Sequence, residues 1–222
     1  MFSDNLSNSL LEYHLLKHPF YQSWNQGTLE ISTLQYYAEQ YFKNVDAFPR
    51  YVSGVHSQCT IKKARKILLE NLIDEERDDE DHPELWLRFA ESLGKNRNEV
   101  ISAEACDATR RLVDGFLDLI RKSYASGLGA LFAYEQQVPA IAASKIKGLK
   151  KFYNYSDDNP GLKFFNVHIT ADEWHSKECA DLLNQLDGAE KEIANESALK
   201  AAKLLWQFLD GVYTHNEKKT GC

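Results

Sequence analysis

Two histidines and an aspartate recur at helical spacing near the middle of the C-terminal half, as His168, Asp172 and His175. On a helix of about 3.6 residues per turn, steps of four and three place all three side chains on one face. Apolar residues continue this face in both directions: Phe164, Phe165, Cys179 and Leu182 or Leu183. The polar trio therefore interrupts an inward-facing stripe. Since buried polar groups must pair or bind metal, the stretch predicts either a hydrogen-bonded core network or part of a metal site.

Two further carboxylates stand on apolar helical stripes elsewhere in the chain. Glu75 follows Ala64, Leu68 and Leu72 on one face, and Glu135 lies between apolar residues on another. The choice of Glu75 within the acidic run 74–81 rests on the stripe alone, because that run could be a solvated loop. His82, just before Pro83, could bind metal or cap a helix.

Together these residues offer three carboxylates and three imidazoles. Mixed oxygen and nitrogen donors suit iron or manganese, whereas thiolate-rich sets suit zinc. His168 and His175 lie about 10 Å apart along a helix axis. If the residues converge, two metal ions fit better than one.

The elements that must position these groups are expected to be helical, since only five prolines and eleven glycines punctuate 222 residues. We predict one domain spanning 1–222, built as a bundle of about seven or eight helices, with a short polar tail over 215–222. The absence of any Glu-x-x-His pair argues against a ferritin-like bundle. The predicted segments that bear on the site are a helix over Asn5–Lys17, a non-helical aromatic connector over His18–Trp24, and helices over Thr33–Cys59, Ile61–Arg77, Leu128–Lys147 (kinked at Pro139) and Ala189–Tyr213.

Composition limits the class of partner. A net charge of -7 argues against nucleic-acid binding, and the basic run Lys145–Lys151 is interpreted as a solvated helix end. No window approaches 18 uninterrupted apolar residues, so no membrane span is expected. Four scattered cysteines and the lack of a signal-like N-terminus predict reduced thiols in a cytoplasm.

Several motifs in order carry a family resemblance. They are Phe20-Tyr21-x2-Trp24, Ala47-Phe-Pro-Arg-Tyr51, Asp74-Glu75-Glu76 followed by His82, Tyr134-Glu135-x-Gln137-x-Pro139, and His168-x3-Asp172-x2-His175. From about residue 10 to residue 210, the chain resembles the chlamydial death-domain-associating protein family. That family belongs to the haem-oxygenase-like helical bundles, with the PQQ synthesis C protein and the TenA thiaminases.

The resemblance implies a non-haem dimetal oxygenase that makes the folate precursor 4-aminobenzoate from one of its own tyrosines, so that each chain acts once. It implies two metal ions, iron or manganese, with dioxygen as co-substrate, a reductant and a homodimer. The implied metal ligands are Glu75, His82, Glu135, His168, Asp172 and His175. Tyr21 matches the sacrificed tyrosine, Lys145 the amine donor, and Tyr134 the aromatic beside the bridging carboxylate.

Residue types alone leave other interpretations open. Tyr21 could be a core aromatic and Lys145 a surface lysine with a snorkelling side chain. Tyr37 and Tyr41, four residues apart, could pack, relay a radical or be the sacrificed residue. At the level of function, the alternatives are a metal-dependent oxidase of the PQQ synthesis C type acting on a diffusible molecule, and a non-catalytic interaction protein. The lack of a cysteine on the Glu135 helix argues against TenA-type nucleophilic chemistry.

Overall fold

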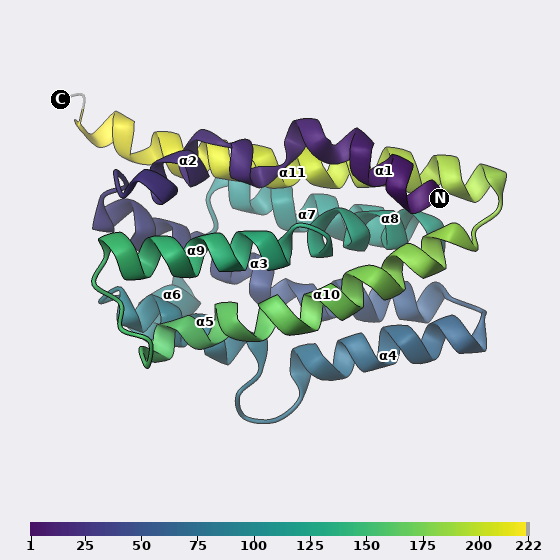
Figure 1. The fold of residues 1–222 in the computed structure, drawn as a ribbon, viewed down its shortest axis with the longest axis horizontal. Helices are drawn as coiled ribbons and strands as arrows, with labels where there is room; N and C mark the ends of the chain where they lie inside the picture. The colour runs from purple at the N-terminus through teal and green to yellow at the C-terminus, as the bar shows by residue number, and fades with distance from the viewer. Residues whose placement is uncertain (221–222) are drawn as a thin grey trace.

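The computed structural model describes the backbone of residues 1–220 and the side chains of residues 1–169 and 174–215. Across this part of the chain all regular structure is helical, and no strand occurs (Figure 1). The predicted all-helical class is therefore confirmed. The α-helices are α1 (Phe2–Leu10), α2 (Pro19–Gln26), α3 (Ile31–Gln58), α4 (Lys62–Glu76), α5 (His82–Ser92), α6 (Arg97–Ser102), α7 (Asp107–Lys122), α8 (Tyr124–Glu135), α9 (Val138–Phe152), α10 (Lys163–Asn184) and α11 (Gly188–Thr220), and the 3-10 helices are η1 (Leu11–Tyr13), η2 (Leu15–Lys17) and η3 (Pro160–Leu162).

Helix α8 is surrounded by other helices, and every residue from Ala125 to Glu135 is buried. An all-round apolar helix of this kind belongs in the middle of a bundle. A glycine permits the closest contact, since a Cβ at Gly129 would lie 2.2 Å from the Ala194 carbonyl oxygen of α11. Glu135 is the last residue of α8 and is thus carried into the core.

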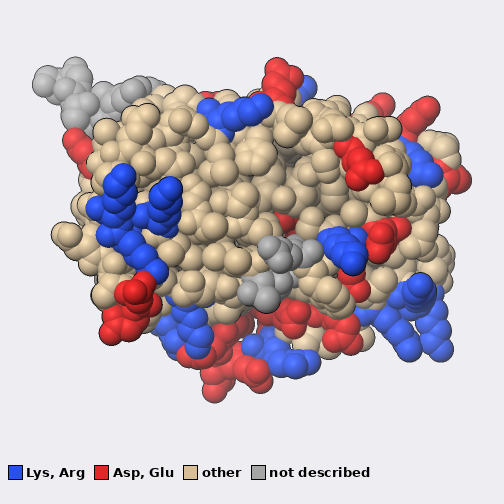
Figure 2. Space-filling model, viewed as in Figure 1, with Lys and Arg blue, Asp and Glu red and all other residues tan. Residues whose placement is uncertain are grey.

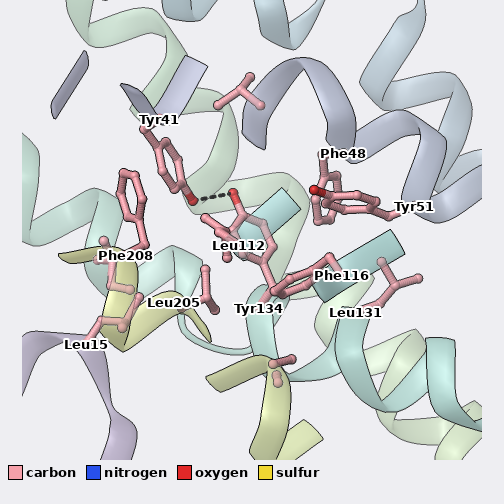
Figure 3. Packing of buried hydrophobic residues seen from close by; sticks show 14 of the residues in the cluster. Leu15, Tyr41, Phe48, Tyr51, Leu112, Phe116, Leu131, Tyr134, Leu205 and Phe208 are labelled. Carbon is pink, nitrogen blue, oxygen red and sulfur yellow. Dashed lines mark hydrogen bonds between the residues drawn. The ribbon is translucent and has the colours of Figure 1, made fainter. Parts of the chain in front are cut away.

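The other helices enclose α8 and one another. Helix α11 packs on α7 and α8, α10 packs on α8 and α9, and α3 contacts α4, α5 and α7. Figure 1 shows α9 and α10 side by side and α1 beside α11. Buried apolar side chains from α1 through α11 form one cluster, part of which Figure 3 shows around Tyr134, Phe48 and Phe116.

The prediction of one continuous helix over Leu128–Lys147 is wrong. The segment consists of two helices, α8 and α9, separated at Gln136 and Gln137. Pro139 has no backbone N–H to donate to the Glu135 carbonyl, and its ring would clash with that group in an unbroken helix. The expected kink is therefore a break.

The expected count of seven or eight helices was also too low, because connecting segments form helices of their own. The first predicted helix ends at Leu10 and continues as η1 and η2, and a short helix, α6, follows α5. The last helix reaches Thr220, beyond the predicted end at Tyr213. The tail residues 216–222 lie outside the described side chains.

The surface carries both signs of charge. In Figure 2, blue and red side chains are intermixed around the edge of the face shown. Ion pairs account for some of this mixing, since Glu80 contacts both Arg88 and Lys163. Among the described residues, no helix combines the length and apolar character needed to cross a bilayer.

Candidate metal centre and tyrosine–lysine cluster

One group of predicted ligands meets where α4, α5 and α10 come together. His82, the first residue of α5, donates from Nδ1 to Glu75 Oε2 at 2.6 Å. The rings of His82 and His168 lie 4.4 Å apart, centroid to centroid. All three side chains are buried, so the selection of Glu75 within the acidic run agrees with its burial, whereas Glu76 is exposed.

His168 is held in a form that suits metal binding. Its Nδ1 donates to the Phe164 carbonyl at 2.5 Å, which leaves Nε2 as the potential ligand atom. Burial, and then the neighbouring His82, hold the pKa of His168 well below its usual range. The imidazole is therefore neutral, as a metal ligand must be.

A second group surrounds Glu135. Its carboxylate accepts from Asn71 Nδ2 at 2.7 Å and from the thiol of Cys179 at 2.9 Å. His175, also buried, donates from Nε2 to Asp74 Oδ2 at 3.0 Å. Helices α4 and α10 contribute side chains to both groups.

Asp172 lies on α10 between the two histidines, but its side chain falls outside the described residues. Among the side chains that are described, no three His, Cys, Asp or Glu residues form a ready-made ligand set. The carboxylates of Glu75 and Asp74 each bond to one imidazole. The donor chemistry nevertheless fits iron or manganese, since two buried carboxylates and three buried imidazoles are available.

Lys145 corrects the prediction of a solvated helix end. It is 5% exposed, whereas Lys147, Lys150 and Lys151 on the same helix are exposed. Its Nζ donates to the Tyr37 hydroxyl at 2.7 Å. Six aromatic rings have their centroids 5.0 to 6.0 Å from Nζ: Tyr21, Trp24, Tyr37, Tyr41, Trp86 and Phe165.

This enclosure changes the chemistry of the amine. Burial lowers the pKa of Lys145 from 10.5 to about 7. Near neutral pH a large fraction of the side chain is thus the free amine, which has a lone pair and can act as a nucleophile.

Tyr21 does not lie in a non-helical connector, as the sequence predicted, but in α2. His18 caps this helix by accepting from the Phe20 N–H at 3.0 Å, and Pro19 occupies its first turn. Gly27 ends it in the left-handed conformation. Both end signals were present in the sequence and were missed because the helix has only eight residues.

A close contact between α2 and α9 brings Tyr21 to Lys145. A Cβ at Gly148 would lie 2.5 Å from the Trp24 ring, so only glycine permits this approach. Trp24 Nε1 in turn donates to the Lys145 carbonyl at 3.3 Å. The Tyr21 hydroxyl lies 3.4 Å from that of Tyr37.

The remaining tyrosines extend this cluster toward Glu135. Tyr37 and Tyr41 stack with centroids 5.4 Å apart, and the Tyr41 hydroxyl donates to that of Tyr134 at 3.2 Å (Figure 3). Burial raises the pKa values of Tyr21 and Tyr37, so both remain protonated phenols. Aromatic contacts thus run from Tyr21 to the residue before Glu135.

A small cavity lies between the metal-ligand candidates and the tyrosine–lysine cluster. Its volume of about 30 Å³ has room for one or two molecules of the size of water. The cavity is lined by Leu15, Tyr21, Tyr41, Tyr134, Val138, Ile141, Ala142, Lys145, Phe164, Phe165 and His168.

The residues that hydrogen-bond to the candidate ligands were not predicted from the sequence. Asn71 occupies the stripe of α4 four residues before Glu75, and a polar residue at that position was the available signal. Asp74, the first residue of the motif Asp74-Glu75-Glu76, is the partner of His175.

The arrangement of helices matches that of known protein structures. A solved TenA homologue from Pseudomonas syringae superposes with a TM-score of 0.82 at 15% identity, covering 96% of this chain and 93% of that one. The fold is therefore the haem-oxygenase-like, TenA-type bundle, as the sequence resemblance implied.

Sequence similarity defines the family. Residues 35–208 match the model of a family described as iron-containing redox enzymes. Proteins named 4-aminobenzoate synthase are 41% identical in Nitrosomonas europaea, over 96% of this chain and 91% of that protein, and 37% identical in Chlamydia pneumoniae, over 96% and 95%. A pyrroloquinoline-quinone synthase from Acinetobacter baumannii is 25% identical, over 93% and 84%. The chain belongs to the iron-containing redox enzyme family and is an oxidoreductase that uses metal.

Proposed function

We propose that this enzyme forms 4-aminobenzoate in an oxygen-dependent reaction that consumes its own Tyr21 and takes nitrogen from Lys145. The observation that carries the proposal is the buried amine of Lys145, 5.6 Å from the Tyr21 ring and 2.7 Å from the Tyr37 hydroxyl. The 4-aminobenzoate synthases at 41% and 37% identity support the same product.

The metal pair, iron or manganese, would be held by the ligands that the resemblance implies: Glu75, His82, Glu135, His168, Asp172 and His175. Such a pair, when bound, supplies electrons to dioxygen. The Phe164 carbonyl and Asp74 orient His168 and His175, because each accepts the N–H of a ring nitrogen.

The protein's own groups prepare the two organic reactants. Burial among the aromatic rings lowers the pKa of Lys145 and keeps a large share of its side chain as the free amine near neutral pH. The hydrogen bond to Tyr37 fixes the direction of that amine. Burial keeps Tyr21 protonated until it is oxidised, and the stacked Tyr37 and Tyr41 offer a path for electrons between Tyr21 and Tyr134.

The size of the cavity favours the chain itself as substrate. A void of about 30 Å³ holds dioxygen or water but not a free aromatic molecule, and the ring nearest to Lys145 in α2 is already that of Tyr21. An oxidase acting on a diffusible substrate, the alternative suggested by the pyrroloquinoline-quinone synthase relative, needs a larger site.

The test is to load the purified chain with iron, manganese or both, add a reductant and air, and follow two quantities together. We expect at most one 4-aminobenzoate per chain, and a matching loss of a tyrosine side chain from the peptide that contains Tyr21. Samples without air, or with a chelator, serve as controls.

Other outcomes point to the competing functions. Repeated turnover with an intact chain would establish the oxidase of a diffusible molecule. Bound metal with an intact chain and no product would point to a substrate other than the chain's own tyrosine. The homodimer, the reductant and the cytoplasmic setting stay predictions from the sequence.

A further inference from the structure

The carboxylate of Glu135 is held at both oxygens by neighbours that have no assigned role. Asn71 Nδ2 donates to Oε1 at 2.7 Å, and Cys179 Sγ donates to Oε2 at 2.9 Å. Asn71 lies on α4 and Cys179 on α10, and Glu135 is the last residue of α8. Two neighbouring helices thus hold one side chain of a third.

The orientation of the Asn71 amide follows from this contact. An ionised carboxylate only accepts hydrogen bonds, so the amide nitrogen must face Glu135 and the amide oxygen must face away. Asn71 is 3% exposed, and its Oδ1 is buried with no hydrogen-bond partner among the described residues. A buried acceptor without a partner destabilises the fold, and leucine would fill the same space without that penalty.

We propose that Asn71 and Cys179 are positioning residues of the metal centre, which hold the Glu135 carboxylate in place to bind metal. Asn71 shares the α4 face with Glu75, four residues later. This face of α4 thus supplies the carboxylate of Glu75 and, through Asn71, orients that of Glu135. The inference rests on the proposed function, because it requires Glu135 to be a metal ligand.

A matched pair of asparagines makes the test specific. Asn44 is also buried, accepts one long bond of 3.4 Å from Tyr51 at its Oδ1, and leaves its Nδ2 without a partner among the described residues. Asn44→Leu is therefore the control for Asn71→Leu. For the thiol, Cys179→Ser keeps a donor and Cys179→Val removes it.

The quantity to measure is the affinity of each purified, metal-free protein for iron(II) and manganese(II), by competition with a chelator. Loss of a group that orients a metal ligand weakens affinity by about 10- to 100-fold. We expect this loss in Asn71→Leu and Cys179→Val, and affinities near wild type in Asn44→Leu and Cys179→Ser. Thermal unfolding of the metal-free variants separates a positioning role from a failure to fold.

Two results would overturn the inference in distinguishable ways. If the wild type binds metal and forms 4-aminobenzoate, and both Asn71→Leu and Cys179→Val bind metal as tightly, only the positioning role is wrong. If the wild type binds no metal, the proposed function fails and the inference fails with it. Since the thiol pair tests the role independently, misfolding of Asn71→Leu alone does not prevent a decision.

Discussion

The amino group of Lys145 donates a 2.7 Å hydrogen bond to the hydroxyl of Tyr37, inside the helical bundle. A lysine normally reaches water with its charged end, but this one is 5% exposed and its nitrogen has aromatic rings around it. Tyr37 is therefore the group that orients the amine, while Tyr21 lies beside it with its ring centroid 5.6 Å away.

The nitrogen of the product is predicted to come from Lys145. Protein made with 15N-lysine should yield 15N-labelled 4-aminobenzoate, and Lys145→Met should yield none. Lys147→Met is the matched control, because Lys147 lies two residues further along α9 and is exposed. Unlabelled product from labelled protein would show that the amine has another source.

The buried lysine also predicts a pH dependence of stability. Its pKa is about 7 in the folded chain and 10.5 normally, so between these values the unfolded state binds more protons and rising pH favours folding. Below pH 7 the cost of burying the charge is complete, and the shift sets it at no more than about 5 kcal/mol.

Denaturant unfolding of the wild type and Lys145→Met measures this effect. We expect the variant to be more stable by the largest margin near about pH 6, and the margin to shrink toward about pH 10. Parallel curves for the two proteins over this range would mean that Lys145 keeps its ordinary pKa.

Tyr21→Phe is predicted to abolish product formation with little change in stability. Its hydroxyl makes a long contact of 3.4 Å with Tyr37, so its loss costs about 1 kcal/mol or less. Tyr51→Phe is the control, since Tyr51 is also buried and makes a 3.4 Å bond, to Asn44. Product from Tyr21→Phe, with side-chain loss mapped to Tyr37 or Tyr41, would reassign the sacrificed residue.

The contact between α2 and α9 predicts that Gly148→Ala is harmful. The new methyl group would meet the Trp24 ring at 2.5 Å, and overpacking of this kind costs about 1–3 kcal/mol. We expect a lower thermal midpoint and a lower product yield, because α2 carries Tyr21. Gly188→Ala, where the added Cβ would meet no atom beyond its chain neighbours and its own helix backbone within 4 Å, should lower neither quantity. Equal effects at the two glycines would argue against this contact as the cause.

Helical periodicity predicted the burial of His168 and His175 but not that of Lys145, for a physical reason. His168 and His175 interrupt an apolar stripe, and Phe165 and Cys179 on that stripe are buried as expected. Lys145 also falls on the inward face of its helix, but lysine can bury its stem and still reach solvent. Only the surrounding aromatic rings, which come from other helices, decide its environment.

The short helix α2 and the break after Glu135 show a second limit. Eight residues are too few for a periodic pattern, although His18, Pro19 and Gly27 carried end signals. Pro139 indicated that the helix is interrupted, but a proline in a helical pattern is compatible with either a kink or a helix end. Hydrogen bonds such as that from Asn71 to Glu135 join positions 64 residues apart, and spacing within one helix cannot reveal them.

The burial of Tyr21 has a consequence for the lifetime of the protein. The side chain is 2% exposed and packs edge-on against Phe20 with centroids 5.3 Å apart. If the proposed function holds, a chain that has reacted lacks the Tyr21 ring and has a void in its place. Truncating a buried aromatic side chain lowers the free energy of unfolding by about 3–5 kcal/mol. Because domains are stable by only about 5–15 kcal/mol, used copies would unfold more often and reach proteases sooner than fresh ones. The reaction would thereby select its own spent molecules for removal.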